Sequence, residues 1–185
     1  MSRAWPVDRL DPRASTEVAA RRILQIRIAE FFSREGIVED PTATEELHDL
    51  RISAKRLRYT LELFADTLGE EAIAAIARVK TLQERLGDLH DADVRIALVA
   101  DELEALAAEQ IRDLVVALAG ADPEWRRALV ATAVRPPNDD PRRGLIDLLA
   151  REIGRRELAY DRFLDAWRGA ISDGLRTRLD RLAAS

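Results

Sequence analysis

Cysteine is absent from this 185-residue chain, and several other residue types are scarce. Without cysteine the chain can form no disulfide, no thiolate metal site and no cysteine nucleophile, and nothing points to an oxidising compartment. Glycine and proline are few, at 8 and 7 residues, and aromatic residues make up only 5%. Ala, Leu, Arg, Glu and Asp dominate instead, and this composition favours helix at nearly every position.

Long apolar runs and an excess of positive charge are also missing. Charged residues cut each apolar stretch, and residues 1–12 lack the hydrophobic core of a signal peptide. We therefore expect a cytoplasmic protein with no membrane partner. The net charge is −5, whereas a nucleic-acid-binding domain is normally basic. No sequence-specific nucleic-acid partner is expected, and any anion site must be local.

The hydrophobic content of 47%, beside 34% charged residues, is enough for one domain with a sizeable core. We predict a single all-α domain over residues 1–185, a helical bundle of four main long helices with one or two short extra helices. Four Asp-Pro pairs, at residues 11, 40, 122 and 140, fit an Asp N-cap followed by Pro at the first helical position.

Helix boundaries follow from these pairs and from the glycines. We expect the first helix to run from residue 12 or 15 to residue 35, and the second from residue 41 or 42 to residue 68. A third begins at residue 70, and two more cover residues 123–134 and 141–171. A kink or break is expected near residues 107–110, a loop over 135–141, and a frayed tail after residue 174. Residues expected to face the core include Val18, Leu24, Ile28, Phe31 and Phe32 early in the chain, and Ile111, Leu114 and Leu118 later.

The second predicted helix carries the densest cluster of positive charge. At about 100° per residue its apolar residues Leu47, Leu50, Ala54, Leu57 and Leu61 share one face. His48, Arg51, Lys55 and Arg58 form a second stripe along the edge of that face, and Arg56 points elsewhere, to solvent. Between residues 48 and 59 the chain has four Lys or Arg residues and one acidic residue, Asp49. Cations that border a buried face point into the groove between two packed helices, which suits a polyanion.

The third predicted helix repeats this arrangement. Lys80, Gln83, Gly87 and His90 share a stripe beside the core residues Val79, Leu82, Leu86 and Leu89, provided that the helix continues through Gly87. Two antiparallel helices would then present a histidine each to one groove, with Gly87 allowing a ligand or backbone to come close. Alternatively, Gly87 breaks the helix and Asp88 or Asp91 caps a new one.

Two His-Asp dipeptides, at residues 48–49 and 90–91, raise the alternative of a metal-dependent phosphohydrolase. Adjacent residues on a helix point about 100° apart, so only one side chain of each dipeptide could reach a shared metal ion. Glu45 and His48 match one of the two Glu-x-x-His motifs of a helical di-iron site. The second motif is missing, because the residue three positions before His90 is Gly87 and not Glu. We predict no catalytic residue, no metal site and no cofactor.

The segments Leu47-His-Asp-Leu-Arg-Ile-Ser-Ala-Lys-Arg-Leu-Arg-Tyr59 and Lys80-Thr-Leu-Gln-Glu-Arg-Leu-Gly-Asp-Leu-His-Asp-Ala-Asp-Val94 resemble the two motifs of the CHAD domain, the conserved-histidine α-helical domain. The resemblance covers a core of about residues 12–106 and, more weakly, the C-terminal helical segment of about 141–183. It implies helical bundles and the binding of inorganic polyphosphate. The implied binding residues are His48, Arg51, Lys55, Arg56 and Arg58 from the first motif, and Lys80, Arg85 and His90 from the second.

We therefore expect non-catalytic binding of inorganic polyphosphate or a similar polyanion. A metal-dependent phosphohydrolase and a structural or protein-interaction bundle, whose cations pair with its own acids, stay open as alternatives. The resembled family pairs two four-helix halves, whereas this chain has one copy of each motif. A homodimer would restore that pairing, and we expect polyphosphate to promote it.

Overall fold

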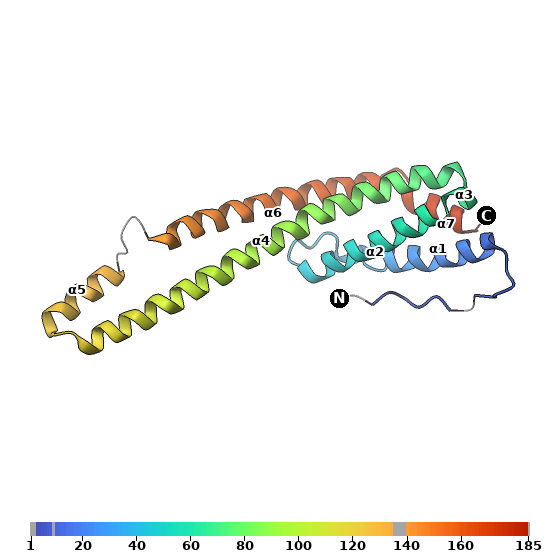
Figure 1. Ribbon diagram of the computed structural model, residues 1–185. Helices are drawn as coiled ribbons and strands as arrows, with labels where there is room; N and C mark the ends of the chain where they lie inside the picture. The colour runs from blue at the N-terminus through green and yellow to red at the C-terminus, as the bar shows by residue number, and fades with distance from the viewer. Residues whose placement is uncertain (1–2, 9, 135–139, 185) are drawn as a thin grey trace. The chain divides into compact units, whose positions relative to one another are not determined.

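The computed structural model describes residues 3–8, 10–134 and 140–184, and all regular elements within them are helices. This confirms the predicted all-α helical bundle. The elements are α1 (Thr16–Phe32), the 3₁₀ helix η1 (Glu35–Ile37), α2 (Thr44–Leu63), α3 (Ala65–Leu68), α4 (Glu70–Gly120), α5 (Pro123–Val134), α6 (Pro141–Ser172) and α7 (Leu175–Ala184). Figure 1 shows the chain coloured from its N-terminus to its C-terminus. No described helix combines the length and the apolar character that crossing a membrane requires.

The chain divides into two compact units. The first is Met1–Asp91 together with Arg156–Ser185, and the second is Ala92–Arg155. The first unit therefore holds both sequence motifs up to Asp91, and the second holds the rest of α4, all of α5 and the beginning of α6. The single domain over residues 1–185 stays a prediction.

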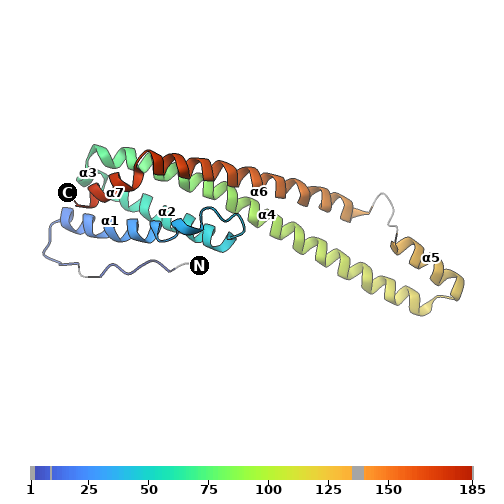
Figure 2. The same cartoon turned by 180° about the vertical axis from the view of Figure 1, so that it is seen from behind.

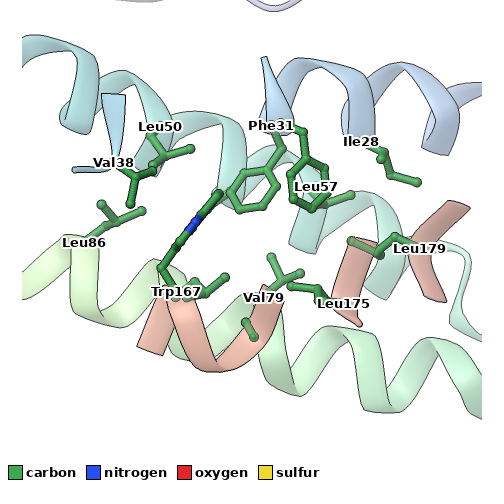
Figure 3. Packing of buried hydrophobic residues seen from close by; sticks show 14 of the residues in the cluster. Ile28, Phe31, Val38, Leu50, Leu57, Val79, Leu86, Trp167, Leu175 and Leu179 are labelled. Carbon is green, nitrogen blue, oxygen red and sulfur yellow. The ribbon is translucent and has the colours of Figure 1, made fainter. Parts of the chain in front are cut away.

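The hydrophobic core lies in the first unit, where α1 packs along α2 and against α7 (Figure 2). Figure 3 shows Phe31 of α1 among Leu50 and Leu57 of α2 and Trp167 of α6. Phe31 is fully buried, and its ring centroid lies 5.4 Å from that of Trp167. These side chains follow the predicted apolar stripes, so the core fixes the rotation of α2 about its axis and thereby places its basic edge.

A buried carboxylate ties α1 to α2. Glu30 is 3% exposed, and its two oxygens accept hydrogen bonds from Arg27 at 2.5 Å and from Arg56 at 2.6 Å. The backbone N–H of Trp5 also donates to Glu30, at 3.4 Å, which attaches the N-terminal segment. The prediction that Arg56 points to solvent is therefore wrong. Together with Arg27, its guanidinium neutralises this buried carboxylate, and a buried charge without such partners is energetically costly.

Two of the four Asp-Pro pairs start a helix as predicted. Asp122 accepts from the backbone N–H groups of Glu124 and Trp125, and Asp140 accepts from that of Arg142. At the other two pairs the Asp side chain closes a local turn, and the helices begin later, at Thr16 and Thr44. Side chains of Asp form such turns as readily as they cap helices.

Several other predictions need correction. Helix α4 is unbroken across residues 107–110, and the residues after 174 form α7, whose Leu175, Leu179 and Leu182 are buried, rather than a frayed tail. Val18 and Ile111, predicted to face the core, are 58% and 62% exposed. Residues 135–139 of the predicted loop lie outside the described residues.

Candidate functional site

Helix α2 carries a polar stripe beside its buried face. Leu47, Leu50, Ala54, Leu57 and Leu61 are each at most 2% exposed, so this face of the helix is held against the core. His48, Arg51 and Arg58 are half-buried along its edge, and Lys55 is exposed. From His48 to Arg58 the stripe extends about 15 Å at the rise of an α-helix. The stripe is therefore positioned by the packing of the apolar face.

The two histidines of the chain meet across α2 and α4. The Nδ1 atoms of His48 and His90 lie 3.2 Å apart, and the ring centroids are separated by 4.3 Å. One ring must donate to the other through Nδ1, with the donor set by the tautomers. Two doubly protonated rings would place two N–H groups face to face, so this geometry holds one extra proton at most. With one extra proton, both Nε2 atoms become N–H donors and the pair carries a single positive charge.

The guanidinium of Arg51 lies against Gly87 of α4. A Cβ atom added to Gly87 would lie 3.7 Å from Arg51 Nε, which is the one atom within 4 Å of it outside the adjoining part of α4. Arg51 Nε is buried without a hydrogen-bond partner, and no carboxylate of the described residues forms an ion pair with this side chain. Gly87 thus leaves room for a cation that no neighbouring acid neutralises. On the same helix Gln83 Oε1 is also buried without a partner.

Tyr59 supports the other two cations of the stripe. The Arg58 guanidinium carbon lies 4.8 Å from the centre of the Tyr59 ring, and Lys55 Nζ lies 5.7 Å from it. Tyr59 is 49% exposed, so the ring forms an accessible cation–π platform. Arg58 also approaches Glu62 at 3.5 Å, although its own Nε is buried without a hydrogen-bond partner. The sequence analysis did not predict this role for Tyr59. The spacing of four residues between Lys55 and Tyr59 could have predicted it, because side chains four apart on a helix are neighbours.

The one acid within this basic segment is directed to another element. Asp49 pairs with Arg34 at 3.2 Å, and Arg34 lies between α1 and η1. Asp49 therefore balances a cation outside the stripe. The segment keeps its positive excess at the edge of α2 that faces His90.

The structure brings together five of the eight predicted binding residues, His48, Arg51, Lys55, Arg58 and His90. The other three are engaged elsewhere. Arg56 pairs with Glu30, Lys80 lies 3.9 Å from Glu84, and Arg85 lies 3.6 Å from Asp88. Lys80 and Arg85 are paired one turn away on their own helix, as is common for solvated helix faces. Helix α4 continues through Gly87, which is the condition under which Lys80, Gln83, Gly87 and His90 were predicted to share a stripe.

His48 lies in an environment that disfavours positive charge on its ring when the site is empty. Burial lowers the pKa of His48 below its ordinary value, and the nearby His90 and Arg51 lower it further, while Asp49 opposes them. A polyanion beside the pair would act in the opposite direction and raise that pKa. The site is therefore built to gain a proton when negative charge arrives.

No group of three His, Asp or Glu side chains that could hold a metal ion occurs in residues 3–8, 10–134 and 140–184. At the first His-Asp dipeptide the two side chains separate, since His48 meets His90 and Asp49 meets Arg34. The residues gathered at the stripe are instead donors and cations, which bind anionic oxygens.

The fold and this stripe define an all-α protein with a basic, histidine-containing edge between two packed helices. The family model of the CHAD domain matches residues 3–100, which is more than half of the chain. The chain belongs to the CHAD family. The searches of curated proteins and of solved structures found no match.

Proposed function

We propose that this protein binds inorganic polyphosphate, or a similar linear polyanion, along His48, Arg51, Lys55, Arg58 and His90, without catalysis. The observation that carries the proposal is the state of Arg51. Its guanidinium is partly buried, its Nε lacks a hydrogen-bond partner, and no acid of the described residues pairs with it. A cation held in this way costs free energy unless an anion compensates it. Family membership supports the same ligand, because polyphosphate binding is what the CHAD resemblance implies.

The spacing of the cations suits an extended ligand better than a compact one. Arg51, Lys55 and Arg58 follow one another along about two turns of α2, so a single phosphate could contact only some of them. A chain of phosphates laid along the stripe would receive charge-assisted hydrogen bonds from each in turn. We therefore expect affinity to rise steeply from orthophosphate to long polyphosphate.

Calorimetric titration of the full chain with orthophosphate, tripolyphosphate and long-chain polyphosphate tests this proposal. The expected order is an affinity that increases with chain length, with no release of orthophosphate when Mg²⁺ is added. Equal weak binding of all three ligands at low salt would contradict an extended site. Release of orthophosphate at a rate that depends on His48 and His90 would favour the phosphohydrolase instead.

Substitutions at Gly87 should report on the position of Arg51. Gly87→Ala should bind polyphosphate normally, since its methyl group meets Arg51 Nε at an ordinary contact distance, and should stabilise α4 by up to about 1 kcal/mol. Gly87→Glu should bind at least about tenfold more weakly, which is about 1.4 kcal/mol, because the new carboxylate can pair with Arg51. Gly87→Gln, which has the same size without the charge, is the matched control. If Gly87→Glu and Gly87→Gln bind equally well in competitive titrations, the charge of Arg51 plays no part.

Acidification should strengthen binding through the histidine pair. The pKa of His48 is lowered in the free protein and is expected to rise in the complex, so the complex holds more protons than its components. Affinity must then increase as the pH falls from about 8 to about 6, by about tenfold for each unit by which the pKa rises. By the same reasoning the free protein loses stability as the pH falls below about 6.5. His48 has a lower pKa in the folded protein than in the unfolded chain, so the unfolded chain binds a proton first.

Titrations of the wild type and of His48→Gln/His90→Gln at pH 8 and pH 6 measure this linkage. The double variant should show an affinity that changes little with pH. Calorimetry in buffers of different ionisation enthalpy should detect uptake of no more than one proton per site in the wild type. An unchanged pH dependence in the double variant would show that the histidines do not bind the linked proton.

A further inference from the structure

The second unit, Ala92–Arg155, contains a cavity whose lining shares no residue with the basic stripe on α2. Its volume is about 350 Å³, which lies within the range of small-molecule sites in proteins. Residues of α4 and α5 form most of the wall, and Asp140 and Arg142, next to the first residue of α6, complete it. Every lining residue belongs to this unit and to the described part of the chain. The cavity is therefore a feature of this unit alone.

Most of the wall of this cavity is apolar. Leu114 of α4 and Leu129 of α5 are half-buried, and Ile111 of α4 is 62% exposed. Ala107 of α4 and Ala133 of α5 add only methyl groups, so the wall has no large side chain at these two positions. Water inside such a wall would find few hydrogen-bond partners, whereas an apolar molecule would remove apolar surface from water. The wall therefore favours an occupant with an apolar body.

The rest of the unit does little to bury these side chains. Among the described residues of the unit only Ala92, Ala121, Asp140 and Glu152 are buried, and none of them is a large apolar residue. The hydrophobic core cluster of the protein is drawn entirely from the first unit. Helices obtain most of their stability from the packing of an apolar face. An apolar molecule in the cavity would supply packing contacts that the side chains of this unit do not provide.

The charged residues of the wall neutralise each other. Asp140 is 8% exposed and accepts hydrogen bonds from the backbone N–H of Arg142 at 2.9 Å and from its guanidinium at 2.5 Å and 3.0 Å. These bonds from Arg142, together with one from the Gln110 side chain, lower the pKa of Asp140 to about 2. A charged ligand would have to compete with an ion pair that is already formed, so the wall favours an uncharged ligand.

One hydrogen-bond acceptor of the wall has no partner. Gln110 Oε1 is buried without a hydrogen bond, which costs free energy. The orientation of the amide follows from its NH₂ group, which donates to the Asp140 carboxylate because an ionised carboxylate can only accept. The Thr132 hydroxyl already donates to the backbone oxygen of Ala128 at 3.1 Å. Among the described lining residues none donates to Gln110 Oε1, and a hydroxyl group of a ligand can supply that bond.

We propose that this cavity binds a small uncharged alcohol or phenol, whose apolar body lies against Leu114 and Leu129 and whose hydroxyl group donates to Gln110 Oε1. At about 30 Å³ for each water-sized group, the volume holds on the order of ten non-hydrogen atoms. The last torsion of a glutamine side chain is soft, so Oε1 can turn toward such a hydroxyl group. The proposal does not depend on the polyanion function, because the two sites share no residue.

Titration of the full chain with 4-propylphenol, followed through the methyl signals of the leucines in nuclear magnetic resonance spectra, tests this site. The signals of Leu114 and Leu129 should shift in a saturable way, while those of Leu50 and Leu57 in the core of the first unit stay unchanged. The compound 4-propylanisole, in which a methyl ether replaces the hydroxyl group, should bind about 3- to 10-fold more weakly because it has no donor. In Gln110→Met the two compounds should bind alike, since the acceptor is absent.

Filling the cavity should remove this binding. Ala107→Phe places an aromatic ring at the wall, so the shifts of Leu114 and Leu129 on addition of 4-propylphenol should be lost. The matched control is Ala105→Phe, on the same helix at an exposed residue outside the lining, and it should bind like the wild type. Circular dichroism checks that both variants are helical. The proposal would be overturned by a wild type whose Leu114 and Leu129 signals do not respond, by equal affinity of the wild type for the two compounds, or by undiminished binding to Ala107→Phe.

Discussion

A variant with Arg51, Lys55 and Arg58 all replaced by Gln is expected to bind polyphosphate about 1,000-fold more weakly than the wild type. Each charge-assisted hydrogen bond contributes about 1.5 kcal/mol or more, and three such losses multiply to this factor. The fold should be retained, because these side chains lie at the edge of α2 while its buried face is apolar. The free protein should lose little stability, since Arg51 Nε and Arg58 Nε already lack hydrogen-bond partners.

The matched control replaces Arg22, Arg112 and Arg162 by Gln, which changes the net charge by the same amount. These three arginines are exposed and belong to α1, α4 and α6, whereas the stripe belongs to α2. The control should bind within about twofold of the wild type, because it leaves all five residues of the proposed site unchanged. Equal losses in the two triple variants would show that net charge alone, and no particular site, governs binding.

Salt should weaken the binding of the wild type about 20-fold between 50 mM and 200 mM. Three cations that each release a counterion from a flexible polyanion give a slope of about −2 for the logarithm of affinity against the logarithm of salt concentration. The triple Gln variant should have a slope near zero, because the counterions are released by the residues that it lacks. Fluorescence titrations at four salt concentrations measure both slopes.

A steep slope that survives in the triple variant would locate the phosphate contacts elsewhere in the chain. A flat slope in the wild type would argue for contacts through uncharged groups, such as backbone N–H groups. In either case the stripe on α2 would not be the main source of affinity.

The helices and the core of the first unit could be predicted because local patterns and packing agree there. Leu50, Leu57 and Val79 repeat at helical spacing and are fully buried in the structure. Ile111 repeats at similar spacing and is 62% exposed, because the second unit has no core to receive it. Periodicity shows which residues share a face. It does not show whether anything covers that face.

The candidate site was predictable in part, for the same physical reason. The phase of α2 placed His48, Arg51, Lys55 and Arg58 on one edge, and that edge follows from the burial of the leucines beside them. The separation of Arg56 from the stripe was predicted from its angle, but its ion pair with Glu30 was not. That pair depends on how α1 packs on α2, which no local pattern contains.

Two further features of the site arise from tertiary packing alone. The distance between His48 and His90 is set by the packing of α2 against α4, although the equivalent places of the two histidines in their motifs suggested a shared groove. The pairing of Asp49 with Arg34 joins α2 to the segment after α1. Asp49 is the acid nearest to Arg51 in sequence, and this pair directs its charge toward Arg34, which lies outside the stripe.

Nuclear magnetic resonance of the arginine side chains tests the central proposal most directly. The Nε–H signals of Arg51 and Arg58, assigned from single Arg→Lys variants, should shift on addition of long-chain polyphosphate, together with the ring nitrogens of His48 and His90. The Nε–H signals of Arg112 and Arg162 should move little in the same titration. Binding that shifts Arg112 and Arg162 while Arg51 and Arg58 stay unchanged would contradict a polyphosphate site on α2.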